Sequence, residues 1–254
     1  MKFTHTFIIA IALILGISGI AYSTNYALLF DGKDDYMNCG MTNLPLKNAP
    51  RTLEAWFKTT SPDGYQQIVG YGTAGTANSA LALFTKGNAI VITQWGASVA
   101  IAAGINDGKW HHAAVTHDGK NTQTIYVDGE AVGNWDRSLD TIATTCIIGS
   151  CLDEKQQFFN GTIDEVRIWD VERTQKEVQD NRHQSLTGKE PHLISDWKFD
   201  EGKGTIAHDS TSNQNDGELA NDPKWVESDV PVEPASADAV SKLATIWGKI
   251  KIAK

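Results

Sequence analysis

Apolar and polar residues alternate along most of the chain, in short runs separated by Gly, Asn and Asp. In the run 51–58, Leu53, Ala55 and Phe57 fall on one face of an extended chain. A period of two is typical of a β-strand with one buried face. Comparable runs occupy residues 26–30, 36–38, 67–71, 80–84, 89–94 and 98–102. Short strands repeated at such intervals predict an antiparallel sandwich rather than an α/β fold.

Residues 109–135 give the strongest local signal. Two runs rich in β-branched, aromatic and small apolar residues, 110–117 and 122–127, flank the turn sequence DGKN. The dipeptide DG at 128–129 then separates the second run from a third, and Asp-Gly suits the type I′ turn of a two-residue hairpin. The sequence therefore predicts a three-stranded meander, which needs a second sheet to cover its apolar face.

The second half of the chain continues the strand pattern. Runs at 145–149 and 162–169 predict two strands joined by a polar loop, and residues 172–183 form the one helical stretch. Residues 193–226 read as a strand, a glycine-rich loop and a last strand, which we expect to complete the sandwich. A truncated second repeat is the weaker alternative, because two isolated strands could not bury an apolar face. The predicted fold is all-β, a two-sheet antiparallel jelly-roll sandwich with one short helix.

Five segments follow one another in an order that is informative about the family. They are ALLFDGKDDYMNCG at 27–40, TLEAWFKT at 52–59, WHHAAVTHDG at 110–119, YVDG at 126–129 and FNGTIDEVRIWD at 159–170. Together they resemble the laminin-G-like domains of the concanavalin A-like lectin and glucanase superfamily, which includes the pentraxins. The resemblance implies a jelly roll of the kind predicted above, and it does not specify a ligand.

The two ends of the chain differ from the middle in composition. Lys2, the apolar run 7–20 and the small residues before position 24 predict a signal peptide over residues 1–23, cleaved after Ser23. An uncleaved anchor is the alternative, although the run is short for a membrane span. We expect a secreted, cell-surface or periplasmic protein whose laminin-G-like domain covers residues 24–228.

Residues 229–254 are predicted to be a linker and a C-terminal tail. The segment 229–238 combines Pro with Val, Glu, Ala and Ser, as extended linkers do. Residues 240–252 place large apolar side chains at helical spacing beside several lysines, so this tail is where contact with a lipid surface or a partner would occur. A frayed terminus is the alternative.

Charge and cysteine content limit the partners and the cross-links. The formal net charge is -9 and the chain has no block of Lys or Arg, so no nucleic-acid partner is expected. Export would permit disulfides among Cys39, Cys146 and Cys151. A local bridge between Cys146 and Cys151 is geometrically plausible, since they flank a strand end and a loop. A bridge from Cys39 to either of them remains open.

The sequence contains no convincing catalytic motif. Retaining glycosidases built on this jelly roll carry their carboxylates on one strand in a pattern like E-x-D-x-x-E, which sets the nucleophile and the acid about 5.5 Å apart. The nearest match here is TIDE at 162–165, in which Asp164 and Glu165 are adjacent and are expected on opposite faces of the strand. His111 and His112 fail as a metal pair on the same ground. We therefore expect a protein that is not an enzyme.

Calcium is the cation that such loops suit best, because they can gather carboxylate, amide and backbone oxygens without a fixed motif. By resemblance to the pentraxins, Asn78, Asp153 and Glu154 are candidate ligands. A second, structural site would bring Asp31 close to Asp164, because the first and last strands of these sandwiches often pair. The alternatives are solvated loop acids and carboxylates that only stabilise turns.

A sugar site would need aromatic platforms as well as hydrogen-bonding groups. Tyr65, Tyr71 and Trp95 lie closest to the predicted loops and are the candidate ligand-binding residues. The sequence favours a secreted, non-catalytic module that binds a glycan or an extracellular protein, with calcium as a candidate cofactor. The alternatives are a polysaccharide-active glycoside hydrolase of the same fold and a structural or adhesion module of a cell-surface assembly.

Overall fold

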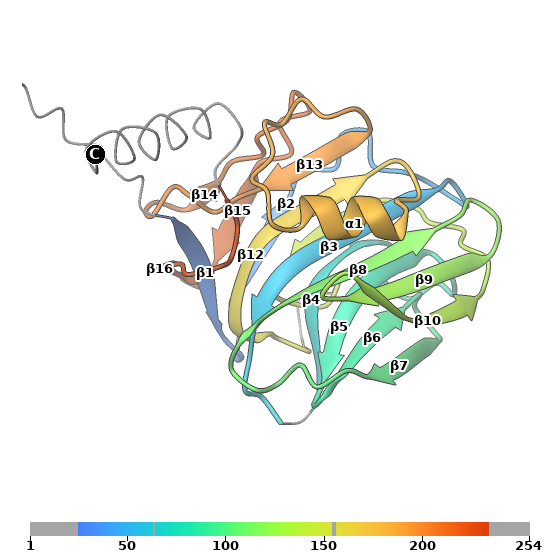
Figure 1. Ribbon diagram of the computed structural model, residues 1–254, viewed down its shortest axis with the longest axis horizontal. Helices are drawn as coiled ribbons and strands as arrows, with labels where there is room; N and C mark the ends of the chain where they lie inside the picture. The colour runs from blue at the N-terminus through green and yellow to red at the C-terminus, as the bar shows by residue number, and fades with distance from the viewer. Residues whose placement is uncertain (1–24, 63, 154–155, 234–254) are drawn as a thin grey trace, which may run out of the picture.

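The computed structural model describes residues 25–62, 64–153 and 156–233. These residues form two antiparallel β-sheets packed face to face, with one short helix on the outside (Figure 1). The predicted signal peptide and the tail beyond residue 233 lie outside the described residues. Within the described part of the chain, no helix has the length and apolar character that crossing a bilayer requires. The predicted all-β sandwich with one short helix is confirmed.

The first sheet, sheet A, has eight strands. They are β1 (Tyr26–Asp31), β3 (Arg51–Lys58), β8 (Trp110–His117), β9 (Thr122–Val127), β10 (Glu130–Asp136), β12 (Asn160–Trp169), β13 (Leu193–Trp197) and β16 (Lys224–Glu227). Seven of them follow the order β10-β9-β8-β3-β12-β1-β16, and β13 pairs with β12 beside this path. The predicted meander is β8-β9-β10. Asp128 and Gly129 both have positive φ angles, 52° and 85°, as a type I′ turn requires.

The second sheet, sheet B, also has eight strands. They are β2 (Tyr36–Cys39), β4 (Tyr65–Gly72), β5 (Ala80–Lys86), β6 (Ala89–Thr93), β7 (Ser98–Ala102), β11 (Thr145–Ile148), β14 (Ile206–Ala207) and β15 (Gly217–Ala220). Their order is β14-β15-β2-β11-β4-β5-β6-β7.

The alternation of side chains along each strand divides the residues between the core and the outer faces. On β5, Leu81 and Leu83 belong to the cluster that fills the space between the sheets, while Ala80, Ala82 and Phe84 belong to separate, smaller clusters. The outward direction of these three residues determines the shape of the outer face of sheet B.

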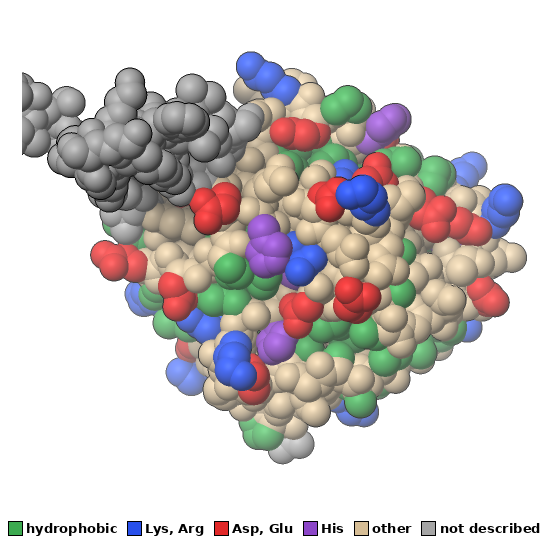
Figure 2. Space-filling view, in the orientation of Figure 1, with side chains coloured by type: hydrophobic (Ala, Val, Ile, Leu, Met, Phe, Trp, Pro, Cys, Tyr) green, Lys and Arg blue, Asp and Glu red, His purple; other side chains and the backbone are tan. Residues whose placement is uncertain are grey.

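Helix α1 (Gln175–Asn181) lies across the outer face of sheet A (Figure 1). A capping box begins it, because the Thr174 hydroxyl accepts from the Glu177 amide and the Glu177 carboxylate accepts from the Thr174 amide. Val178 is its buried residue and packs against Ala114 and Tyr126. Basic and acidic side chains are interspersed on this face of the molecule, with no large area of one sign (Figure 2).

The last part of the chain contributes strands to both sheets. In sheet A, β13 pairs with β12 and β16 pairs with β1; in sheet B, β15 pairs with β2. Trp197 is fully buried in the core between the sheets, and its indole N–H donates to the carbonyl of Asn215 at 2.8 Å. Residues 193–227 are therefore built into the sandwich.

Candidate functional site

A groove with a floor of small side chains lies on the outer face of sheet B. Its centre is formed by β4 and β5, where Gly70 pairs with Ala82. Ala80 and Ala82 line the hollow, and Phe84 and Trp95 extend beside it. Because the side chains of Ala80 and Ala82 are only methyl groups, the surface is recessed relative to these aromatic rings. We call this hollow and its continuation toward β7 the outer groove.

The loop that follows β11 forms one wall of the outer groove. Leu152 packs on the same outer cluster as Ala80 and Ile147. The loop is attached to β4 by a backbone hydrogen bond of 3.0 Å from Gln67 to the carbonyl of Gln157. The sequence predicted a polar loop here, but its return over the sheet depends on these tertiary contacts.

The outer groove consists of two adjoining cavities. One has a volume of about 220 Å³ and includes Gln67, Trp95 and Leu152 in its lining. The other has a volume of about 290 Å³ and includes Tyr65 and Ser98. The two cavities share lining residues, which makes them one continuous depression. The shared residues are Phe84, Thr93, Gly96 and Gln157.

The polar groups of the outer groove are amides, hydroxyls, the indole of Trp95 and the thiol of Cys151. Gln67 is fully buried; its Nε2 donates to the carbonyl of Ile147 at 3.0 Å, and its Oε1 has no hydrogen-bond partner among the described residues. None of the described residues that line either cavity carries a formal charge. Aromatic faces beside neutral donors and acceptors suit a ligand with apolar faces and hydroxyl edges.

Two of the three predicted aromatic residues line the outer groove. Trp95 is half-buried and has a left-handed backbone conformation, with φ 54°. Tyr65 lies at the other end of the groove, with the ammonium group of Lys86 4.5 Å from its ring centroid. A hydrogen bond with Ser98 and the charge of Lys86 lower the pKa of Tyr65.

The structure does not support Tyr71 as a ligand-binding residue. Tyr71 is fully buried in the core, because it alternates in phase with Val69 on the inward face of β4. Its hydroxyl donates to the carbonyl of Pro45 at 2.9 Å and accepts from Arg51 at 2.9 Å. Burial raises the pKa of this phenol well above its usual range. Phe84 and Gln67 line the groove but were not predicted from the sequence, although the alternation along 80–84 places Phe84 on the face opposite Leu81 and Leu83.

Asn78 and Asp153, two of the three predicted pentraxin-like calcium ligands, are engaged in other contacts. The Oδ1 atom of Asn78 accepts from Nε of Arg137 at 2.7 Å, so a guanidinium holds the oxygen that a cation would need. The Asp153 carboxylate accepts from the thiol of Cys151 at 2.6 Å. Glu154, the third predicted ligand, lies outside the described residues.

Asp31 and Asp164 do not come together at one ion site. The antiparallel register places Asp31 opposite Asn160, four residues along β12 from Asp164 and thus about 13 Å away at about 3.3 Å per residue. Asp31 lies instead with Asp34 and Asp35, whose carboxylate oxygens are all within 4.8 Å of one another. This cluster could hold a metal ion.

The expectation that Asp164 and Glu165 point to opposite faces is wrong. A β-bulge interrupts the pairing of β12 with β3, and Glu165 takes a φ of 47° there. Ile163 and Val166 therefore both reach the core. The two carboxylates lie together on the outer side, where Asp164 accepts from Ser228 at 2.7 Å.

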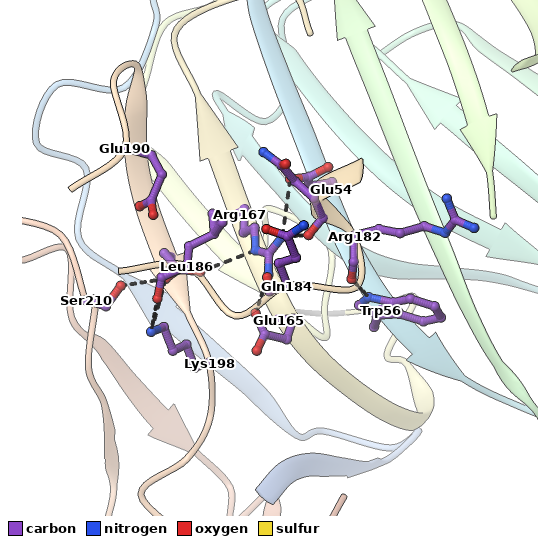
Figure 3. Close-up of polar contacts among 12 residues, drawn as sticks. Glu54, Trp56, Glu165, Arg167, Arg182, Gln184, Leu186, Glu190, Lys198 and Ser210 are labelled. Atoms are coloured by element: carbon purple, nitrogen blue, oxygen red, sulfur yellow. Dashed lines mark hydrogen bonds and ion pairs between the residues drawn. The ribbon is translucent and has the colours of Figure 1, made fainter. Parts of the chain in front are cut away.

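Glu165 belongs to a buried ionic centre around Arg167 (Figure 3). Arg167 forms ion pairs with Glu165 at 2.6 Å, Asp196 at 3.4 Å and Glu54 at 3.9 Å. It also donates to the carbonyls of Asn181, the last residue of the helix, and of Gln184, just after it. The arrangement attaches the end of α1 to sheet A, and the carboxylates are turned toward this cation rather than toward solvent.

The predicted bridge between Cys146 and Cys151 is not present in the structure. The two side chains lie on opposite sides of sheet B: Cys146 belongs to the core between the sheets, whereas Cys151 packs with Phe84 and Val91 on the outer face.

Comparisons with known proteins agree with this architecture. One solved structure, a Bacteroides ovatus protein provisionally described as carbohydrate-binding, matches 84% of this chain with 19% identity and a TM-score of 0.67. The chain spans 62% of the length of that protein. A heptameric SAP-like pentraxin from Limulus polyphemus matches over 62% of this chain and 82% of its own, with 17% identity and a TM-score of 0.50. At these identities the likeness shows a shared fold.

A protein-family model covers more than half of the chain. It matches residues 31–179, which include the meander, helix α1 up to residue 179 and every described residue that lines the outer groove. The chain therefore belongs to the laminin-G-like family of the concanavalin A-like lectin/glucanases superfamily.

Proposed function

We propose that this protein is a non-catalytic carbohydrate-binding module whose outer groove holds a neutral sugar. The observation that carries the proposal is the lining of the groove: the half-buried Trp95 and the ring of Tyr65 flank a floor of small residues, and the described lining has no formal charge. A pyranose presents an apolar face that suits an aromatic ring and hydroxyls that suit amide groups. The likeness to the Bacteroides ovatus protein supports this class of ligand.

Hydrolysis is the less favoured activity, although the superfamily includes glucanases. A glycosidase needs two carboxyl groups on either side of a glycosidic bond in an accessible site. Asp164 and Glu165 share one side of sheet A, but both are buried, and Glu165 is ion-paired with Arg167. A sugar bound in the outer groove would lie on the other sheet.

Calcium is not a required part of the proposed site. Among the described residues, the groove lining contains no carboxylate, and calcium prefers oxygen ligands that include carboxylates. The cluster of Asp31, Asp34 and Asp35 lies apart, at the turn between β1 and β2. We also propose export, from the sequence of residues 1–23; N-terminal sequencing of the mature protein would test it.

Substitution of Trp95 tests the function. Isothermal titration with neutral gluco-, galacto- and manno-oligosaccharides, together with a sialylated and a uronic-acid oligosaccharide, would first identify a ligand. For the best neutral sugar, Trp95→Ala is expected to weaken binding at least about tenfold, or 1.4 kcal/mol.

Trp110→Ala provides the matched control. Trp110 is also half-buried, but it lies on β8 of sheet A, where its indole N–H donates to Asp229 at 2.6 Å. This variant should bind the sugar like the unmodified protein. Selective binding of the acidic sugars, or equal losses in the two tryptophan variants, would contradict the proposal.

A further inference from the structure

Cys39 and Cys146, which are both thiols in the structure, lie opposite each other on neighbouring strands of sheet B. The register of β2 with β11 pairs Asn38 with Ile147 and Met37 with Ile148. One step further along the same ladder, Cys39 faces Cys146. Both side chains are buried in the core between the two sheets.

This placement meets the distance requirement for a disulfide. Residues directly opposite in an antiparallel pair have Cα atoms about 4.5–5.5 Å apart. Disulfides span Cα separations of about 4.4–6.8 Å. Both side chains project into the core on the same side of the sheet, which is the orientation that a bond between the two sulfurs requires.

The third cysteine, Cys151, is on the wrong side of the sheet to bond with Cys39 or with Cys146. Cys151 packs against Phe84 and Val91 on the outer face, with sheet B between it and the two core cysteines. The thiol of Cys146 is close enough to Cys39 to contribute to its electrostatics. Burial raises the pKa of Cys39, and the neighbouring Cys146 raises it further.

We infer that Cys39 and Cys146 form a cross-strand disulfide when the chain folds under oxidising conditions. A disulfide oxidant such as glutathione disulfide accepts the two electrons. One cysteine thiolate attacks it, giving a mixed disulfide and one glutathione thiolate. The second cysteine thiolate then attacks the protein sulfur of that mixed disulfide and releases the second glutathione thiolate. The two protons lost by the cysteines are taken up by the released thiolates.

The bond would join two parts of sheet B that are distant in sequence. β2 carries β15 on its other side, where Cys39 pairs with Gly217, and β11 leads to the rest of the sheet through β4. The link would therefore fasten the β14-β15-β2 edge to the middle of the sheet. Because both thiols are buried in the folded protein, oxidation is expected during folding rather than after it.

Refolding of the full chain from denaturant, with and without a mixture of reduced and oxidised glutathione, tests the inference. After quenching with acid, the protein is denatured, labelled with a maleimide and digested. The chain has three cysteines. Oxidative refolding should lower labelling from three sulfurs to one, that of Cys151. A peptide pair containing Cys39 and Cys146, lighter by two hydrogen atoms, should appear, and the melting temperature should exceed that of the reduced protein.

Serine variants distinguish a bond between Cys39 and Cys146 from a bond that involves Cys151. Cys151→Ser should keep the linked peptide pair and the higher melting temperature of the oxidised form, whereas Cys39→Ser should lose both. Full labelling of all cysteines after oxidative refolding would overturn the inference. A linked pair that contains Cys151 would also overturn it, and peptide mapping of the unsubstituted chain detects this even if a variant fails to fold.

Discussion

Gly70 and Ala82 face each other across β4 and β5, and a Cβ atom built on Gly70 would lie only 2.3 Å from the Cβ of Ala82. Two side chains cannot occupy that space. The Cβ of Ala82 therefore requires a glycine at position 70, and a larger group added at Ala82, which lines the outer groove, would extend into the cavity.

Ala82→Leu is expected to fill the outer groove without disturbing the core. Ala82 faces away from the space between the sheets, so the added carbons would occupy the 220 Å³ cavity. Sugar affinity should fall at least about tenfold, while the midpoint of urea unfolding should change little. Ala100→Leu is the control, because Ala100 is opposite Val91 on the same face but does not line either cavity. Equal effects of both variants on affinity would argue against the groove as the binding site.

Removal of divalent cations should leave sugar binding unchanged. The Asn78 oxygen is hydrogen-bonded to Arg137, whose positive charge would repel a cation at that position. Titration calorimetry in EDTA and in millimolar calcium should therefore give the same affinity. A loss of binding in EDTA that calcium restores would place a cation in the ligand site. Melting temperatures in the same two buffers would report separately on the cluster around Asp35.

The strands could be predicted because their determinants are local. The strand at 51–58 and the Asp128-Gly129 turn depend on neighbouring residues, and both are present in the structure. The second face of that strand, which the alternation left exposed, is also buried, because other parts of the chain cover it. Register and bulges depend on the partner strand instead. The extra residue at Glu165 that turns two adjacent carboxylates to one side leaves no signature in a single sequence.

The candidate site could be predicted only in part for the same reason. Tyr65 begins β4 and Trp95 lies in the turn between β6 and β7, so their proximity to loops pointed to the groove. Tyr71 is near the end of the same strand as Tyr65. It lies two residues after Val69, however, and therefore points inward on the same face as Val69. The wall made by Leu152 requires a loop to fold back over β5, and this contact joins residues distant in sequence.

Arg167→Met should strongly destabilise the protein. It would leave Glu54, Glu165 and Asp196 buried without their common cation, and breaking a buried ion pair from one side typically costs about 3–5 kcal/mol. Urea unfolding at neutral pH should show this loss. Lys176→Met is the matched control, since Lys176 forms an exposed ion pair with Asp180 and should change the free energy of unfolding by less than about 1 kcal/mol. Similar losses in the two variants would mean that the buried centre has no special role in stability.

The pH dependence of stability should show whether burial or the ion pair with Arg167 dominates the pKa of Glu165. Burial, with a smaller effect of Asp196, raises its pKa to about 7, against the opposing attraction of Arg167. The folded protein then retains a proton that the unfolded chain releases near pH 4.5, so this stabilisation is complete below about pH 4.5 and is lost as the pH rises through about 7. Its full size would be about 3 kcal/mol, at about 1.4 kcal/mol per pKa unit.

Glu165→Gln isolates this contribution, because glutamine does not titrate. The buried His112, whose lowered pKa has the opposite effect on stability, is present in both proteins and largely cancels in the difference. The free energy of unfolding of the variant minus that of the unmodified protein, measured by urea titration from pH 4.5 to 8, should therefore increase with pH. A difference that stays constant over this range would show that the ion pair with Arg167 outweighs burial and holds the pKa of Glu165 at or below its usual value.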